Sequence, residues 1–136
     1  MDISKLVVHC SDSPNYSDID AEEIHRWHKK RKWSGIGYHK VIRRDGTVEN
    51  GRPEYWKGAH VKGYNSTSLG VCLIGRDQFT DAQMRSLERV LIEWKAKYSN
   101  ADVCGHRDLD SHKTCPNFDV KAWWSEVWRS VRSLYQ

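Results

Sequence analysis

Short apolar runs and longer amphipathic segments alternate along the chain. The apolar runs at residues 3–10, 69–74 and 101–104 are bounded by polar or turn-forming residues and predict buried strands. Residues 38–44 and 47–50 flank Asp45 and Gly46, a pair that strongly favours a tight hairpin turn. The pattern therefore predicts three separate strands and one hairpin.

Three segments have apolar residues at the spacing of a helix. The first begins at Asp18 or Asp20, either of which can cap a helix, and continues to about residue 32. Thr80 and Gln83 have the spacing of a capping box and open the second helix, while Asp119 can cap the third. The second helix has an apolar stripe formed by Met84, Leu87, Leu91, Trp94 and Tyr98.

The order of these elements is strand, helix, three strands, helix, strand, helix. This order is typical of an α/β protein in which helices flank a mixed central β-sheet. A chain of 136 residues suffices for one domain with a real core but not for two ordinary domains, so we expect a single domain over residues 1–136. His9 and His106 would each lie at the C-terminal end of a strand, which is where such sheets often have their ligand-binding or active sites.

Composition narrows the class of protein further. No apolar stretch approaches the roughly 20 residues of a membrane span, so membrane insertion is not expected. The first residues do not resemble a secretory signal, and we expect the protein to be made in the cytoplasm. Disulfides are rare in that compartment. Cys72 and Cys104, which lie in predicted strands, are therefore expected to be small buried residues.

The net charge of +4 suits an anionic partner such as nucleic acid, anionic lipid or an acidic cell-wall polymer. The basic run from His28 to Trp33 has flanking aromatic residues and could follow a phosphate backbone. A solvated helix end explains the same run, because cations there favour the helix dipole. No recognised nucleic-acid motif accompanies it, so nucleic acid is not expected as a partner.

Two histidines and a cysteine offer the ligands of a catalytic zinc site. His9 and His106 each follow an apolar run and need a polar partner when buried. Cys115 precedes Pro116 in a polar loop, where a structural cysteine has little reason to be. Three protein ligands with the fourth position open are typical of catalytic zinc. Cys10 should point to the strand face opposite His9 and is not expected to share the metal.

The other histidines have simpler explanations. His25 and His28 are three apart on a helix and could chelate a metal, but we expect one to face solvent and the other to pack beside Trp27. His39 and His60 are intermediate candidates for a site. No compact metal-binding motif is present, so the spacing of these residues does not by itself define a metal site.

Segments spread over nearly the whole chain match one family in collinear order; they are residues 8–11, 27–29, 37–39, 44–49, 62–65, 68–73, 83–84 and 113–119. Through them the chain resembles the type 2 N-acetylmuramoyl-L-alanine amidases, zinc enzymes that share a fold with peptidoglycan recognition proteins. Within that family it resembles the T-seven kind of phage lysozyme, which is an amidase despite its name. The resemblance implies hydrolysis of the amide between the lactyl group and L-alanine in bacterial peptidoglycan, by a phage or prophage endolysin or a bacterial recycling amidase.

The resemblance also implies roles for individual residues. The residues that match the family's zinc ligands are His9, His106 and Cys115. Tyr38 and Lys113 match two further catalytic residues, and His60 matches a histidine that lines the substrate groove. No acid lies beside Tyr38, so the identity of the general base stays open.

Two differences from the phage lysozyme bear on partners and specificity. The chain begins almost at its first predicted strand, so we do not expect the N-terminal extension of that lysozyme or a polymerase contact made through it. The loop from His106 to Cys115 also differs in sequence.

We expect the protein to be a monomer in the host cytoplasm. It would act on the wall after a separate membrane-permeabilising protein has released it. The alternative is a peptidoglycan-binding module without activity, although such modules typically lack the zinc cysteine.

Overall fold

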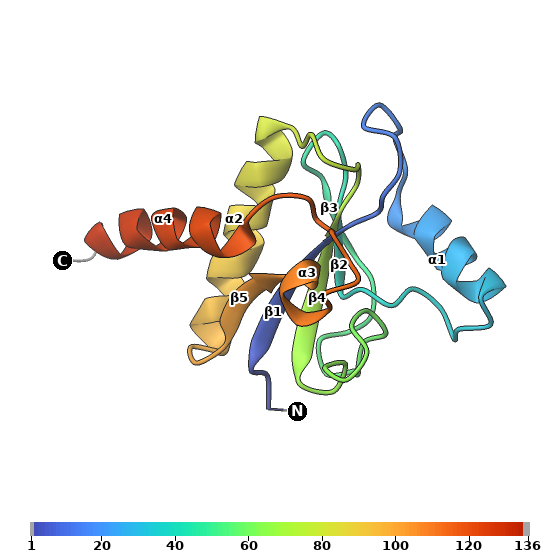
Figure 1. Ribbon diagram of the computed structural model, residues 1–136, viewed down its shortest axis with the longest axis horizontal. Coiled ribbons are helices and arrows are strands. Elements are labelled where there is room, and N and C mark those ends of the chain that lie inside the picture. The colour runs from blue at the N-terminus through green and yellow to red at the C-terminus, as the bar shows by residue number, and fades with distance from the viewer. Residues whose placement is uncertain (1, 135–136) are drawn as a thin grey trace.

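A five-stranded mixed sheet with the order β3-β2-β4-β1-β5 forms the centre of the protein (Figure 1). The computed structural model describes residues 2–134; Met1, Tyr135 and Gln136, which the predicted domain also includes, lie outside the described residues. The strands are β1 (Lys5–Cys10), β2 (Lys40–Ile42), β3 (Val48–Asn50), β4 (Ser68–Leu73) and β5 (Asp102–Gly105). Only β3 is antiparallel, to β2, because the predicted hairpin joins these two strands.

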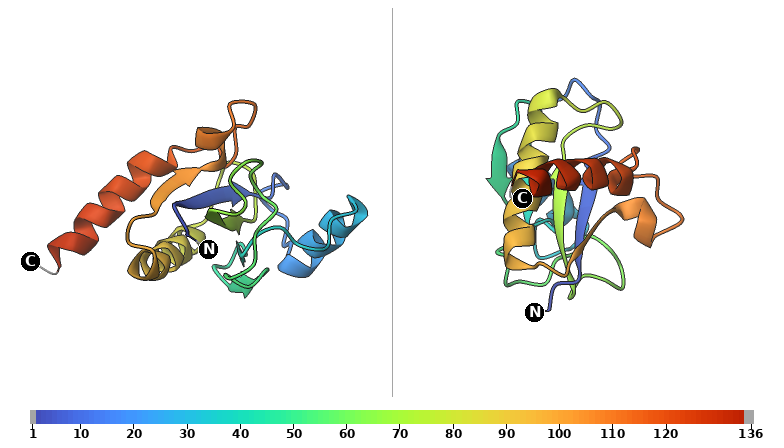
Figure 2. Two further views of the ribbon diagram at one scale, coloured as in Figure 1. Left: turned by 90° about the horizontal axis from the view of Figure 1, so that it is seen from below. Right: turned by 90° about the vertical axis from the view of Figure 1, so that its left-hand side faces the viewer.

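Three longer helices and one short helix surround the sheet; they are α1 (Ala21–Lys30), α2 (Asp81–Lys97), α3 (His106–Leu109) and α4 (Val120–Ser133). The helix α2 lies along the sheet, and α4 contacts β5 and projects from the body of the molecule (Figure 2). The helix α1 lies at the opposite end of the molecule from α4 (Figure 1). None of the helices within residues 2–134 is both long and apolar enough to cross a membrane.

The two faces of the sheet bury different sets of side chains. Leu6 and Val8 of β1 join the main core, in which Leu87 and Trp94 of α2 and Trp124 of α4 are also buried. Successive strand residues point to opposite faces. Val7 and His9 alternate with Leu6 and Val8 along β1 and therefore face the other side of the sheet. On that side Val7 packs with Val61 and Cys104. The sheet thus presents His9 on the face that α2 does not cover.

The predicted helix starts are confirmed. Asp20 and Asp119 cap α1 and α4 by accepting hydrogen bonds from Glu23 N and Ala122 N. Thr80 and Gln83 form the reciprocal capping box at the start of α2. Each interaction satisfies a backbone N–H that has no partner inside its helix.

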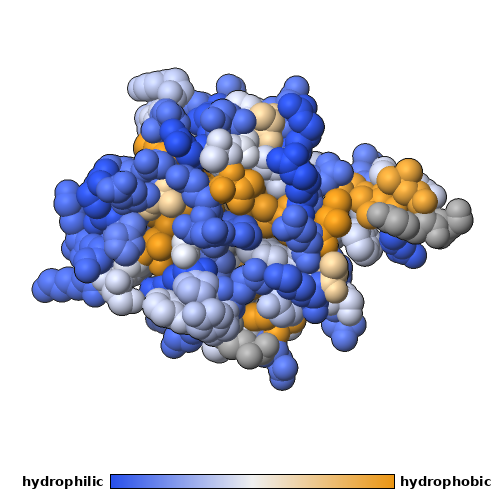
Figure 3. Space-filling model, turned by 180° about the vertical axis from the view of Figure 1, so that it is seen from behind, coloured by the Kyte–Doolittle hydropathy of each residue, from blue (hydrophilic) through white to orange (hydrophobic). Residues whose placement is uncertain are grey.

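The predicted α/β class, a mixed sheet flanked by helices, is confirmed. Strand ends differ by one or two residues from the prediction, and only α3 was not predicted. Cys72 and Cys104 are buried in strands as expected. The face shown in Figure 3 is mainly hydrophilic, with hydrophobic groups on the projecting α4 and in several places on the body of the molecule. On α4, Trp123, Val127 and Trp128 are only partly buried.

Candidate metal centre

His9, His106 and Cys115 come together from three different segments. His9 lies near the C-terminal end of β1, and His106 begins α3 directly after β5. Because β1 and β5 are parallel neighbours, with Val8 beside Gly105, the two histidines emerge at the same edge of the sheet. Their Nδ1 atoms are 3.1 Å apart. The metal-binding atoms of all three residues lie within 4.8 Å of one another.

The geometry and the donor types fit a zinc ion. Tetrahedral zinc with Zn–N bonds of about 2.0–2.1 Å places two ligating nitrogens about 3.3 Å apart. The observed separation of 3.1 Å between the two Nδ1 atoms is close to this value. Two imidazoles and one thiolate form a mixed nitrogen and sulfur set that suits zinc. The three residues could therefore hold this metal with little movement.

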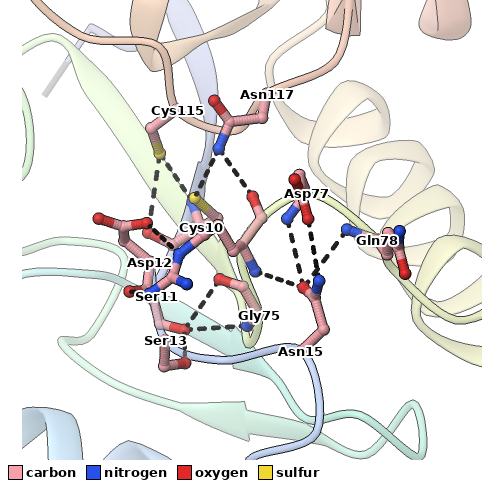
Figure 4. Close-up of polar contacts among 11 residues, drawn as sticks. Cys10, Ser11, Asp12, Ser13, Asn15, Gly75, Asp77, Gln78, Cys115 and Asn117 are labelled. Atoms are coloured by element: carbon pink, nitrogen blue, oxygen red, sulfur yellow. Dashed lines mark hydrogen bonds and ion pairs between the residues drawn. The ribbon is translucent and has the colours of Figure 1, made fainter.

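The Cys115 sulfur is held against the end of β1 (Figure 4). The backbone N–H of Cys10 donates a hydrogen bond of 2.8 Å to the Cys115 sulfur. The backbone N–H of Arg107 donates to the Cys115 carbonyl oxygen, which ties this loop to α3. A backbone donor aimed at sulfur stabilises the thiolate that a metal requires.

A network of amides fixes the neighbouring loops. The Asn15 Oδ1 atom accepts hydrogen bonds from the backbone nitrogens of Arg76, Asp77 and Gln78 after β4 (Figure 4). Asn117 donates from Nδ2 to the Arg76 carbonyl oxygen. These bonds connect the loop after β1, the loop after β4 and the segment that follows Cys115.

Burial keeps the histidines of the site neutral. Desolvation lowers the pKa of His9 well below its usual value, with repulsion from His60 and His106 adding to the effect. Desolvation, aided by the positive charge of Lys113, also lowers the pKa of His106. For Cys115, a hydrogen bond with the Cys10 side chain and burial raise the pKa of the thiol. Neutral imidazoles are ready to bind a metal, whereas the thiol must lose a proton.

Tyr38 lies beside the metal-binding group. Its ring centre is 5.0 Å from that of His9. Burial raises the pKa of the Tyr38 hydroxyl well above its usual value. The hydroxyl therefore keeps its proton at neutral pH and can act as a hydrogen-bond donor.

Lys113 is exposed on the loop between α3 and Cys115. Its backbone N–H donates to the Asp110 carbonyl oxygen, which anchors the base of the side chain. The residue belongs to the loop that connects His106 to Cys115, two of the three metal-binding residues.

His60, which the resemblance assigns to the substrate groove, is buried, with only 8% of its surface exposed to solvent. Its Nδ1 atom is 2.8 Å from Nε2 of His9, so the ring contacts a candidate metal ligand directly. Desolvation lowers the pKa of His60 to about 3. Sequence reasoning missed this contact, because His60 follows no regular pattern and its partner lies 51 residues away.

His25 and His28 are not part of the metal-binding group. His25 is exposed and His28 is buried, as predicted for this pair. The aromatic rings packed against His28 are those of Trp33 and Tyr38.

A pocket with a volume of about 610 Å³ lies between α1 and residues 50–56, and His25 is among the residues that line it. Arg52 and the half-exposed Trp56 are among the residues that line it.

Comparison with known proteins gives matches over most of the chain. Residues 1–118 match the N-acetylmuramoyl-L-alanine amidase family. The endolysin of Klebsiella phage KP32 is 47% identical over 90% of this chain and 86% of its own length. The endolysin of Escherichia phage T7 is 43% identical over 89% of this chain and 85% of its own length. The solved structure of the N-acetylmuramoyl-L-alanine amidase LysC from Clostridium intestinale URNW is 30% identical, with a TM-score of 0.84 over 96% of this chain and 86% of LysC.

Proposed function

The chain belongs to the N-acetylmuramoyl-L-alanine amidase family, and from this premise we infer that it is an endolysin that hydrolyses the amide between the lactyl group of N-acetylmuramic acid and L-alanine in peptidoglycan. The observation that carries the proposal is the convergence of His9, His106 and Cys115 at one edge of the sheet. The endolysins of the related phages support this assignment.

The metal ligands in this proposal are Nδ1 of His9, Nδ1 of His106 and the sulfur of Cys115. A zinc ion bound there supplies Lewis-acid chemistry toward a carbonyl group and a water molecule. The chain contributes the orientation of the ligands, because β1 and β5 fix the two histidines and the Cys10 N–H fixes the sulfur. A single thiolate among the ligands makes the metal less electrophilic than three histidines would, so positive charge from the protein matters more.

Lys113 and Tyr38 are the two further catalytic residues that we propose. The Lys113 ammonium group would stabilise the negative charge that develops on the carbonyl oxygen as the amide is attacked. The Tyr38 hydroxyl, which keeps its proton, would donate a hydrogen bond to that oxygen or to the leaving nitrogen. Arg52 and Trp56 line a pocket that could accept part of an anionic, sugar-containing polymer.

The proposal extends to the state and location of the protein. We propose that residues 1–136 act as one catalytic domain and as a monomer, which reaches the wall after release from the cytoplasm of the host. The net charge of +4 favours binding to a polymer whose stem peptides carry free carboxylates.

Digestion of purified peptidoglycan tests the proposed reaction. The protein is incubated with the polymer with and without a zinc chelator, and the products are analysed by mass. We expect release of intact stem peptides with a free L-alanine amine, abolished by chelation and restored by zinc. If the zinc-loaded protein sediments with the polymer but releases no peptide, the amidase proposal is wrong and a binding module takes its place.

A further inference from the structure

A line of hydrogen bonds runs from His9 into the interior of the protein, away from the metal-binding atoms. The Nε2 atom of His9 is 2.8 Å from Nδ1 of His60. The Nε2 atom of His60 is 3.2 Å from the Ser68 hydroxyl, and this hydroxyl is 2.7 Å from the carbonyl oxygen of Tyr64. His60 and Ser68 are both buried, and Ser68 is fully inaccessible to solvent.

The far end of this line determines the direction of every bond in it. A carbonyl oxygen can only accept, so the single Ser68 hydroxyl proton points to Tyr64. The Ser68 oxygen must then accept from His60, which requires a proton on Nε2 of His60. In a neutral imidazole one nitrogen donates and the other accepts, so Nδ1 of His60 accepts from Nε2 of His9.

We infer that the Tyr64 carbonyl oxygen, acting through Ser68 and His60, fixes the tautomer of His9 so that its Nδ1 atom presents a lone pair to the metal. His60 and Ser68 are positioning residues in this inference, which rests on the proposed zinc site. Metal-bound histidines commonly donate their other ring nitrogen to an outer partner, which fixes the tautomer and orientation of the ring. Here that partner is a second histidine whose own tautomer is fixed by a backbone group.

The surroundings of His60 hold its ring in the orientation that the line requires. Asn65 Oδ1 accepts hydrogen bonds from the backbone nitrogens of His60 and Val61, which fixes the loop on both sides of the ring. Gly70 of β4 lets the ring lie against the strand, since a Cβ atom there would be 2.7 Å from Nδ1 of His60. The position of the ring is therefore set by the fold and does not depend on the metal.

The Ser68→Ala variant tests the inference, with Ser86→Ala as the matched control. Ser86 is also buried and donates to a backbone carbonyl oxygen, that of Gly46, but it belongs to α2 on the other face of the sheet. Zinc affinity is measured for each full-length protein by competition with a chromophoric chelator. We expect Ser68→Ala, which acts on His9 through His60, to bind zinc about tenfold more weakly, the lower end of the loss seen when a direct outer partner of a metal ligand is removed. Ser86→Ala should match the unmodified protein within twofold. Equal zinc affinity in all three proteins would overturn the inference.

Nitrogen-15 NMR of the imidazole rings reads the tautomer directly. In the unmodified protein, with zinc and after chelation, we expect His60 to carry its proton on Nε2 and to have an unprotonated Nδ1. A proton on Nδ1 of His60 would overturn the inference whatever the zinc affinities are. Neither measurement uses peptidoglycan, so a protein that binds zinc through this line but cleaves nothing would contradict the proposed function and leave the inference intact.

Discussion

At the scale of single residues, the site combines groups that the fold keeps neutral with one exposed positive charge. His9 and Tyr38 are held in their uncharged forms by burial, whereas Lys113 lies on the surface. The residue types of the metal-binding group could be predicted from the sequence because each was unusual in its setting. The contact between His60 and His9 could not, because it depends on a loop without periodicity that folds back onto β1.

Replacing Lys113 by alanine should separate activity from metal binding. The side chain is exposed, so its loss should leave the fold and the zinc content unchanged. The loss of a charge that stabilises the transition state should lower the rate of peptidoglycan hydrolysis by about a hundredfold or more. The measurements are turbidity loss of a peptidoglycan suspension and zinc content by atomic absorption. Lys121→Ala, which removes an exposed lysine of α4, is the control. Full activity in Lys113→Ala would refute the proposed role.

His28 should make the stability of the protein depend on pH. Desolvation, aided by the charges of Arg31 and Arg52, lowers the pKa of the buried His28 to about 4, against about 6.5 in the unfolded chain. The unfolded state therefore binds a proton that the folded state does not. The free energy of unfolding should fall as the pH decreases from about 6.5 to about 4, by up to about 3 kcal/mol from this residue.

A His28→Gln variant isolates this contribution, because glutamine can still accept from the Gly37 N–H that His28 binds through Nδ1. Urea unfolding of the metal-free proteins at several pH values gives the two stability curves. We expect the variant to lose less stability than the unmodified protein between pH 6.5 and 4. Parallel curves would show that His28 titrates normally in the folded protein.

At the scale of elements, sequence patterns located every helix and strand except α3. Hydrophobic periodicity and caps were strong signals because α2 and α4 each bury one face against the sheet. The helix α3 is only four residues long, too short for any periodicity. The strand ends depend on pairing with neighbours distant in the sequence, such as Lys5 with Ser68, which explains their shifts of one or two residues.

The cap of α4 should contribute measurably to stability. Asp119 accepts a hydrogen bond of 3.1 Å from the backbone N–H of Ala122. Asp119→Ala should lower the free energy of unfolding by about 1 kcal/mol, whereas Asp119→Asn, which retains a capping oxygen, should change it little. Guanidinium unfolding monitored by tryptophan fluorescence measures both. Equal losses in the two variants would mean that the charge of Asp119 matters and its capping bond does not.

At the scale of the whole molecule, the candidate metal site joins parts of the chain that only the folded sheet brings together. A ligand that binds the folded state alone stabilises it by about 4 kcal/mol at a thousandfold excess over its dissociation constant. For a protein of this size we expect zinc to raise Tm by about 10 °C. Differential scanning calorimetry with and without a chelator measures the shift.

The same shift tests the ligand assignment of Cys115. In Cys115→Ala we expect zinc to leave Tm almost unchanged, because one of three protein ligands is missing. Cys104→Ala, which removes a buried cysteine of β5, should be less stable but should keep the full rise with zinc. An undiminished rise in Cys115→Ala would exclude this cysteine as a ligand.

The wide spacing of the three proposed ligands also determines when, during synthesis, the chain can first bind the metal. His9 and His106 are 97 residues apart, and at about 5–20 residues per second a ribosome needs about 5 to 20 s to pass from one to the other. A nascent chain that has grown only to the end of α2 carries His9 but neither of the other two ligands. Metal capture through these ligands, and with it wall-degrading activity, therefore becomes possible only after the chain has been made as far as Cys115 and the strands that frame the site have emerged.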